Sequence, residues 1–391
     1  MTSGPLIYLI AGEASGDRLG ASLMDGMRQL SPDVRFVGIG GPLMQSRGFN
    51  SLFAMEELSI MGLVEVLPRL HDLFKRRDEV VADILRIQPD ALVTIDSPGF
   101  TLRVAKAARK QCKAPFIHYV APSVWAWKPG RAAKMARYID HVLVLLPFEP
   151  PYMQAAGMSC DFVGHPVAAE PVASAQDCAA LRNTLKITPE SKLLTILPGS
   201  RRGEVDRLAP IFAKTAQLLQ GKIAQLRVVV PAAQARLVTP LQQAFADTDA
   251  IILPPLPDSD AFEAQKRALF ATSDVALAAS GTVSLELAAA GVPMVIGYQM
   301  APLTGWLMRQ MALVDTVTLV NLLSDSRAVP EFLFSNCTPE NLAPALLTLL
   351  QNTAAANTQR AAGQAAMRAI GQGGEAPGLR AAKAVLGRIT P

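Results

Sequence analysis

The sequence predicts an α/β protein built from two Rossmann-like doubly wound domains that face a cleft. Apolar strand-like runs alternate with amphipathic helix-like segments along most of the chain. Two segments, residues 6–17 (LIYLIAGEASGD) and 193–204 (LLTILPGSRRGE), share the same order of apolar strand, glycine-serine turn and helix start. In α/β folds, ligands bind at such strand-to-helix turns. At 391 residues the chain is also too long for one ordinary core, which favours two domains.

The first half of the chain is expected to form one parallel sheet. Its predicted strands are residues 6–11, 35–39, 91–95, 116–120, 141–146 and 161–163, with helix-like spacing between several of them, as at 19–30 and 102–110. Small residues and prolines at 166–176 (PVAAEPVASAQ) then predict an interdomain linker.

The second half repeats this alternation and ends in an alanine-rich tail. Its predicted strands are residues 193–197, 226–230, 250–253, 275–278, 294–296 and 318–320. A last helix at 379–389 has an apolar stripe and must dock on another surface. We therefore expect a first domain at 1–168, a second at 169–365, and a segment at 366–391 that packs back on the first domain or on a partner subunit.

Composition narrows the class of protein. A net charge of +4 is too small to indicate nucleic-acid binding, and no apolar run is long enough to cross a bilayer. No basic leader precedes Leu6, so we expect a cytoplasmic protein without a cleaved signal. The four cysteines are scattered and the four histidines form no metal-binding pair, so neither a metal nor another cofactor is expected.

The turn after residue 197 carries residues suited to a diphosphate. Gly199 and Ser200 can form a tight turn with outward amides, and Arg201 follows at the expected helix start. Amide and guanidinium donors of this kind suit phosphate oxygens. An ordinary polar turn with solvated arginines explains the residues equally well.

A second loop, residues 280–286 (SGTVSLE), predicts the rest of a nucleotide site. Ser280 or Thr282 can cap a helix and donate to phosphate, and Gly281 permits close approach. Glu286 lies one helical turn beyond Thr282 and could accept both hydroxyls of a ribose. The alternative is a solvated helix residue, but its apolar neighbours favour function.

Several motifs then give a family resemblance. IAGEASGD (10–17), DSPGF (96–100), APSVWAW (121–127), FVGHP (162–166), LPGSR (197–201) and VNL (320–322) occur in this order. Together they resemble the lipid-A-disaccharide synthases, glycosyltransferases of the two-domain GT-B type. The resemblance spans residues 6 to about 345. One departure is Phe334, where a glutamine is expected, and it leaves the role of Glu331 open.

The resemblance implies a reaction and its partners. The donor would be UDP-2,3-diacylglucosamine and the acceptor 2,3-diacylglucosamine 1-phosphate (lipid X). The acceptor 6-hydroxyl would displace UDP with inversion, giving the β-1,6-linked lipid A disaccharide 1-phosphate. The protein would associate peripherally with the cytoplasmic surface of the inner membrane of a Gram-negative bacterium. A homodimer that exchanges C-terminal elements is consistent with the family, and no nucleic-acid partner is implied.

Site residues of the first domain follow from strand ends and from the resemblance. Asp96, after the strand at 91–95, is the expected general base, although a turn-closing role is the commoner one for such a residue. Glu13 is an alternative base or a ligand of the acceptor sugar. Ser15, Trp125 and Asn321 are expected near the sugars. The mechanism requires Asp96 and Arg201 to approach one gap from the two domains.

Residues 60–77 predict a membrane-facing surface. Its members are Met61, Leu63, Val64, Val66, Leu67, Leu70, Lys75, Arg76 and Arg77. Apolar and basic side chains together suit an interface with anionic lipid. An amphipathic helix packed on the protein core explains the apolar spacing equally well.

Other functions remain open at this stage. A UDP-N-acetylglucosamine 2-epimerase or a peptidoglycan glycosyltransferase would have the same fold. A dinucleotide-dependent oxidoreductase is disfavoured because GEASGD is not GxGxxG. A non-catalytic lipid-binding scaffold is the third alternative.

Overall fold

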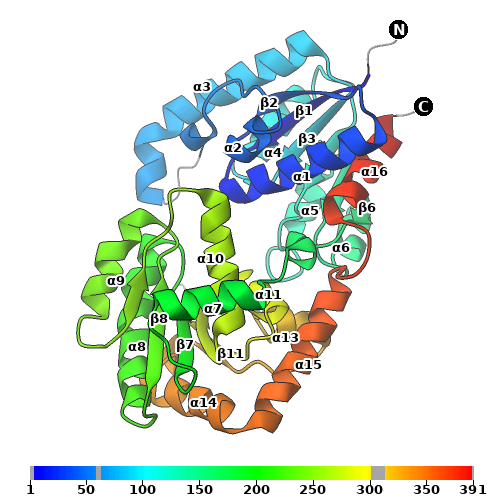
Figure 1. Cartoon of the computed structure of the whole chain (residues 1–391). Coiled ribbons are helices and arrows are strands. Elements are labelled where there is room, and N and C mark those ends of the chain that lie inside the picture. The colour runs from blue at the N-terminus through cyan, green and yellow to red at the C-terminus, as the bar shows by residue number, and fades with distance from the viewer. Residues whose placement is uncertain (1–3, 59–62, 301–312, 390–391) are drawn as a thin grey trace. The chain divides into compact units, whose positions relative to one another are not determined.

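The chain forms two compact α/β units. The computed structural model describes residues 4–58, 63–300 and 313–389, with side chains described outside 63–70. The first unit comprises Met1–Ala169 with Ile370–Pro391, and the second comprises Glu170–Ala369. Each unit contains one six-stranded parallel sheet, so the predicted pair of Rossmann-like domains is confirmed (Figure 1).

The sheet of the first unit has the strand order β2-β1-β3-β4-β5-β6, and all pairs are parallel. The strands are β1 (Leu6–Ala11), β2 (Arg35–Ile39), β3 (Ala91–Ile95), β4 (Phe116–Tyr119), β5 (His141–Val144) and β6 (Ser159–Phe162). The chain leaves β1 for β2 on one side and returns to β3 on the other. The loops after β1 and β3 therefore meet at the point where α/β sheets bind ligands.

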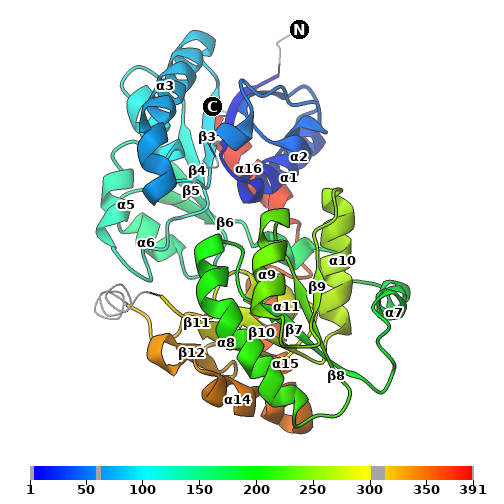
Figure 2. The ribbon, with the colours of Figure 1, turned by 90° about the vertical axis from the view of Figure 1, so that its left-hand side faces the viewer.

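Helices cover both faces of this sheet, with α1, α2 and α16 on one face and α3 and α4 on the other (Figure 2). The helices and 3-10 turns are α1 (Ala14–Leu30), α2 (Pro42–Gln45), η1 (Met55–Glu57), α3 (Leu63–Ile87), α4 (Thr101–Ala108), α5 (Gly130–Met135), α6 (Pro150–Gln154), η2 (Pro166–Ala169) and α16 (Pro377–Ile389).

The C-terminal helix α16 packs on α1 of the same chain. Ala381, Ala382 and Val385 of its apolar stripe are fully buried. A Cβ added to Gly26 of α1 would lie 2.6 Å from the Gly378 carbonyl oxygen. The two helices thus approach so closely that glycine is required at the contact.

The second unit has the strand order β12-β11-β10-β7-β8-β9, again parallel. Its strands are β7 (Lys192–Leu197), β8 (Leu226–Pro231), β9 (Ile251–Leu253), β10 (Val275–Ala279), β11 (Met294–Tyr298) and β12 (Glu331–Leu333). The direction of winding reverses between β7 and β10, so the loops after these two strands form the second switch point.

Two groups of helices flank this second sheet. Helices α8, α9 and α14 form one contacting group, and α7, α10, α11, α13 and α15 form the other. Their bounds are α7 (Ala175–Thr184), α8 (Arg202–Gln220), η3 (Ala235–Leu237), α9 (Val238–Ala244), α10 (Ser259–Thr272), α11 (Val283–Ala289), α13 (Leu319–Ser324), η4 (Phe334–Asn336), α14 (Pro339–Gln351) and α15 (Thr353–Ala369).

One predicted strand is wrong. Residues 318–320 enter helix α13, and the sixth strand of this sheet is β12 instead. The carboxylate of Glu331 accepts the backbone N–H groups of Val317 and Thr318, which satisfies donors at the start of α13. A short apolar run carries no periodicity that separates strand from helix, and this tertiary contact decides between them.

The loop between β2 and α2 is held by a buried carboxylate of α1. Asp17 is 2% exposed and accepts hydrogen bonds from the backbone N–H groups of Gly41, Leu43 and Met44 at 2.8–3.0 Å. Asp17 thereby supplies the acceptor that the free backbone N–H groups at the N-terminus of α2 need. Asp17 therefore has a structural role at this switch point.

We expect Asp17→Ala to destabilise the first unit strongly. Three backbone donors lose their acceptor, at about 1–3 kcal/mol each, so the melting temperature should fall by roughly 10 °C. Thermal unfolding followed by circular dichroism measures this shift. Asp25→Ala is the matched control on the same helix, because it breaks only an exposed pair with Arg47. Equal melting temperatures for the two variants would contradict the assignment.

Candidate functional site

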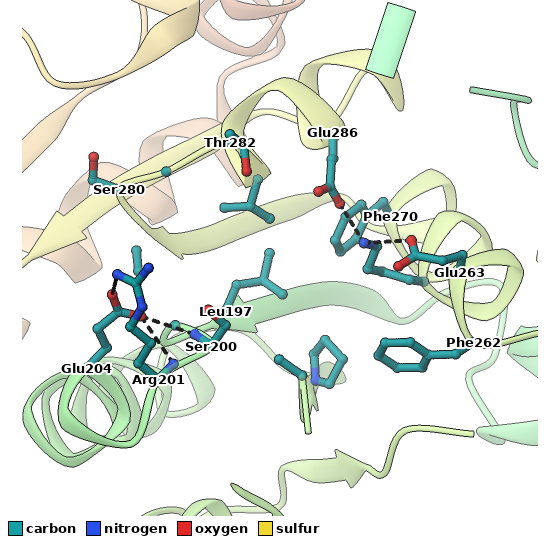
Figure 3. Close-up of a pocket in the computed structure, with 17 residues that line it drawn as sticks. Leu197, Ser200, Arg201, Glu204, Phe262, Glu263, Phe270, Ser280, Thr282 and Glu286 are labelled. Carbon is teal, nitrogen blue, oxygen red and sulfur yellow. Dashed lines mark hydrogen bonds and ion pairs between the residues drawn. The ribbon is translucent and has the colours of Figure 1, made fainter. Parts of the chain in front are cut away.

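A cavity of about 430 Å³ opens at the switch point of the second unit, beside the ends of β7 and β10 (Figure 3). The loop after β7 and the loop after β10 both contribute to its wall. All seven residues predicted to bind the donor nucleotide line it: Gly199, Ser200, Arg201, Ser280, Gly281, Thr282 and Glu286. The structure thus brings the two predicted loops together, and their contact with a nucleotide stays a prediction.

The loop after β7 is wrapped around a carboxylate of its own chain. Gly199 has φ +113°, and a Cβ there would lie 2.7 Å from the Cβ of Glu204. The backbone N–H groups of Ser200 and Arg201 both donate to Glu204 Oε2, at 3.1 and 3.3 Å. The amides predicted to hold a diphosphate therefore already bind an anion. A diphosphate on the same amides would have to replace the Glu204 carboxylate.

Sequence reasoning missed Glu204, although a signal was present. The residue stands three positions after Arg201, which is the spacing of a capping box at a helix start. The Arg201 side chain is 64% exposed, and its Nη1 lies 3.6 Å from Glu204 Oε1. This long, exposed contact leaves most of the guanidinium donors available to another anion.

The loop after β10 differs in detail from the expectation. Thr282 is the N-cap of α11, but its side chain makes no capping hydrogen bond. Its φ and ψ of −61° and −22° are helical, whereas a capping side chain needs an extended backbone. Ser280 Oγ instead lies 3.4 Å from the Val317 carbonyl oxygen. A Cβ added to Gly281 would meet no atom within 4 Å, so the space beside this glycine is open.

Glu286 is part of a three-residue charge cluster that sequence reasoning missed. Lys266 of α10 places its Nζ 2.9 Å from Glu286 Oε2 and 2.8 Å from Glu263 Oε2. Burial alone would lower the pKa of Lys266, but the two carboxylates outweigh it and raise that pKa. The Glu263–Lys266 spacing was visible as a helical i,i+3 pair, whereas the contact with Glu286 exists only in the fold.

The switch point of the first unit joins two carboxylates to serines of the opposite loop. Ser15 Oγ, after β1, donates to Asp96 Oδ2 at 3.2 Å, and Ser97 Oγ, after β3, donates to Glu13 Oε1 at 3.0 Å. Asp96 and Ser97 both have positive φ, +50° and +43°. Non-glycine residues adopt this conformation at an energetic cost and do so most often at functional sites. The structure thus brings the two candidate bases and Ser15 together.

Trp125 is anchored rather than free. Its indole Nε1 donates to Glu149 Oε1 at 3.1 Å, and its ring packs edge-on against Phe148 at 5.1 Å. Burial of Glu149 raises the pKa of this carboxyl to about 7, against the opposing effect of its hydrogen bonds. This contact fixes one end of the 121–127 loop, and a role of Trp125 in sugar binding stays a prediction.

Asn321 lies in a buried polar network of the second unit. It is 1% exposed, and its amide donates to the Val329 carbonyl oxygen at 2.9 Å and accepts from the Val329 N–H at 3.0 Å. Glu331 accepts from Thr316 Oγ1 and from nearby backbone N–H groups. Glu331 therefore organises the segment before β12, while the expected sugar contact of Asn321 stays a prediction.

The predicted membrane segment is only partly described. Met61 lies outside the described residues, and Leu63, Val64, Val66, Leu67 and Leu70 are placed on the backbone of α3 alone. Arg76 is bound internally, because it pairs with Glu57 and Glu79 at 2.6 Å each. Arg77 pairs with Asp78. Lys75 is exposed and has no acidic partner among the described residues.

No cluster of three or more histidine, cysteine, aspartate or glutamate side chains suited to a metal ion occurs among the residues that the structure describes. None of the described helices is both long and apolar enough to span a bilayer.

We expect Gly199→Ala to destabilise the second unit. Alanine would have to adopt a φ of +113° and would press its Cβ against Glu204, so the loop must change shape. The melting temperature of the second unit should fall by several degrees, consistent with a loss of about 1–3 kcal/mol.

Gly203→Ala is the control for this substitution. Gly203 lies in the first turn of α8 with no atom closer than 4.0 Å to an added Cβ. Alanine there should leave the melting temperature unchanged or raise it slightly. The same small effect at both glycines would show that the turn at 199 does not require positive φ.

Comparison with known proteins identifies the family. The family model for lipid-A-disaccharide synthetase matches residues 7–381. The lipid-A-disaccharide synthase of Ruegeria pomeroyi is 53% identical over 386 residues, which cover 98% of this chain and 95% of that protein.

Solved structures agree on the fold. The UDP-GlcNAc 2-epimerase of Neisseria meningitidis, bound to UDP-GlcNAc, superposes with a TM-score of 0.61 at 12% identity and 98% coverage of both chains. A glycosyltransferase of Rickettsia africae gives 0.60 at 11% identity and 99% coverage of both. These similarities concern architecture alone. From the family match and the close relative together, the chain belongs to the lipid-A-disaccharide synthase family of GT-B glycosyltransferases.

Proposed function

We propose that this glycosyltransferase moves a 2,3-diacylglucosamine unit from its UDP derivative to the 6-hydroxyl of 2,3-diacylglucosamine 1-phosphate. The products are the β-1,6-linked disaccharide 1-phosphate and UDP. Family membership over residues 7–381 carries this assignment. The same family membership does not favour an epimerase, a peptidoglycan glycosyltransferase or a non-catalytic scaffold.

The second unit is proposed to bind the donor. The convergence of the seven predicted residues on one cavity supports this assignment. As the bond between C1 of the donor and the diphosphate breaks, UDP departs with the electron pair. Arg201 and the amides of residues 200–201 are proposed to stabilise that charge after the Glu204 carboxylate turns away, and the anion contact these amides already make supports this role. No metal ion is required in this proposal.

The first unit is proposed to supply the base. The acceptor hydroxyl must lose its proton as its oxygen attacks C1, and a carboxylate at a strand end suits that task. Asp96 is the preferred base, and the hydrogen bond from Ser15 supports a fixed orientation of its carboxylate. Glu13, bound to Ser97, is the alternative base.

We expect Asp96→Asn to lower kcat by about 10²–10⁴-fold, because the amide cannot take the proton. Binding of UDP should be unchanged, since Asp96 and the donor cavity belong to different units. Mass spectrometry of the disaccharide 1-phosphate measures turnover, and calorimetry measures UDP binding. Asp33→Asn, at an exposed position of the same unit, is the control and should retain both. Full turnover in Asp96→Asn, with loss in Glu13→Gln, would move the base to Glu13.

The start of α3 is proposed to meet the membrane surface that holds the acylated substrates. Residues 63, 66, 67, 70 and 74 are all apolar and follow helical spacing along α3. Phe74 is 40% exposed. Among the side chains that the structure describes in this segment, Arg76 is paired with Glu57 and Glu79, and Lys75 is a cation without an acidic partner. The apolar residues are therefore proposed to supply most of the attraction.

We expect the combined change of Val64, Val66, Leu67 and Leu70 to serine to release the protein from anionic lipid vesicles in a flotation assay. The loss of buried apolar area should lower vesicle binding at least tenfold. The control carries four serines at other exposed apolar positions: Leu30, Val172, Leu218 and Leu256. Retained vesicle binding by a folded α3 variant would contradict this surface.

A further inference from the structure

Charged groups of both signs lie at each end of the proposed donor cavity. Arg201 and Glu204 lie at one end, and Glu263 and Glu286 lie at the other, with Leu197 between them (Figure 3). Three glutamates thus line a cavity proposed to bind an anionic diphosphate. An anion entering here would be repelled unless cations neutralise those carboxylates.

Lys266 is the cation at the Glu286 end. Its side chain is only 19% exposed, and those of Glu263 and Glu286 are 18% and 20% exposed. Its Nζ contacts one oxygen of each carboxylate, at 2.8 and 2.9 Å. At this degree of burial an ion pair is screened far less than on the surface. The pairing therefore fixes where the Glu286 carboxylate points.

The ion pair leaves part of Glu286 available. Lys266 contacts Oε2, and Oε1 has no partner among the residues that the structure describes. Phe262 and Phe270 line the same end of the cavity. A carboxylate with one free oxygen beside aromatic side chains suits a nucleoside, whose ribose hydroxyls donate hydrogen bonds and whose base is apolar on its faces.

We propose that Lys266 is a positioning residue that orients the Glu286 carboxylate to accept the 2′- and 3′-hydroxyls of the donor ribose, so that this pair selects a ribonucleotide over a 2′-deoxyribonucleotide. This proposal rests on the proposed function, in which the cavity binds UDP. Lys266 itself acts through Glu286. Without Lys266, the Glu286 and Glu263 carboxylates would repel each other and turn apart.

The test compares the binding of UDP and 2′-deoxy-UDP by calorimetry. In the native protein, UDP should bind about tenfold more tightly, because one charge-assisted hydrogen bond is lost with the 2′-hydroxyl. Lys266→Met should weaken the binding of both nucleotides, because a neutralising cation is lost, but it should weaken UDP about tenfold more than 2′-deoxy-UDP. The ratio of the two dissociation constants should therefore approach one. Glu286→Gln should reduce the ratio in the same way. Lys222→Met, at an exposed lysine of the same unit, should keep the native ratio.

A second variant guards against misfolding. Glu263→Gln combined with Lys266→Met removes one charge of each sign, so it leaves a single carboxylate in place of the pair. It should show the same reduced ratio with a melting temperature close to that of the native protein.

The outcomes separate the two proposals. A native ratio in Lys266→Met, with a reduced ratio in Glu286→Gln, would overturn the role of Lys266 and leave the donor site in place. If Lys266→Met lost affinity equally for both nucleotides, Lys266 would have only a structural role. That result would also overturn the proposal that Lys266 positions Glu286 for the ribose. Equal binding of UDP and 2′-deoxy-UDP by the native protein would overturn the same proposal. Failure of the native protein to bind either nucleotide would overturn the proposed donor site as well.

Discussion

The pairing of strands that are distant in the sequence is the constraint on which both sites depend. In the first unit β1 pairs with β3, and in the second β7 pairs with β10, each pair parallel and in register. Parallel pairing places the carboxyl ends of both strands at the same edge of the sheet. The loops carrying Glu13 and Asp96 meet for this reason, as do those carrying Arg201 and Thr282. Helices on both faces keep these buried strands in place.

Carboxylates of the chain itself hold several of the loops. Asp17 accepts three backbone N–H groups, Glu331 accepts two, and Glu149 accepts the N–H groups of Leu146 and of the Trp125 indole. Glu204 makes the same kind of contact with its loop, but it lines the cavity at the switch point of the second unit. Asp17 and Glu149 are 2% and 4% exposed, so both carboxylates are almost closed to solvent. The Glu204 side chain, 22% exposed, is accessible to a competing anion.

This contrast explains how one local motif can serve structure and function. A helix start with free amides is costly to leave without an acceptor, and Glu204 supplies one. A phosphate group offers more charge and more acceptor oxygens than a carboxylate, and its exchange with Glu204 on the same donors is part of the proposed function. At the other end of the cavity, Lys266 is part-buried and pairs with two carboxylates, so this cluster keeps a net charge of −1. The two ends of the cavity thus differ in charge: one end has an exposed arginine, and the other has a lysine already paired with two carboxylates.

Local sequence was sufficient for most strand positions and for the types of residue that the loops carry. Continuous apolar runs and glycine turns located eleven of the twelve strands, because buried parallel strands and their turns have a strong local signal. Motif order was also sufficient to identify the family, since it depends on residues along the chain and not on their placement.

Tertiary structure decided which polar groups face one another. The contact of Lys266 with Glu286 joins two helices, and the contact of Ser15 with Asp96 joins two loops, so no sequence spacing reveals either. The helix at 319–324 likewise depends on Glu331 in a later strand. The sequence by itself determined where most strands and turns form, through local propensity, and which residue types lie at each switch point. Hydrogen bonds and ion pairs between distant segments determined which group each carboxylate binds.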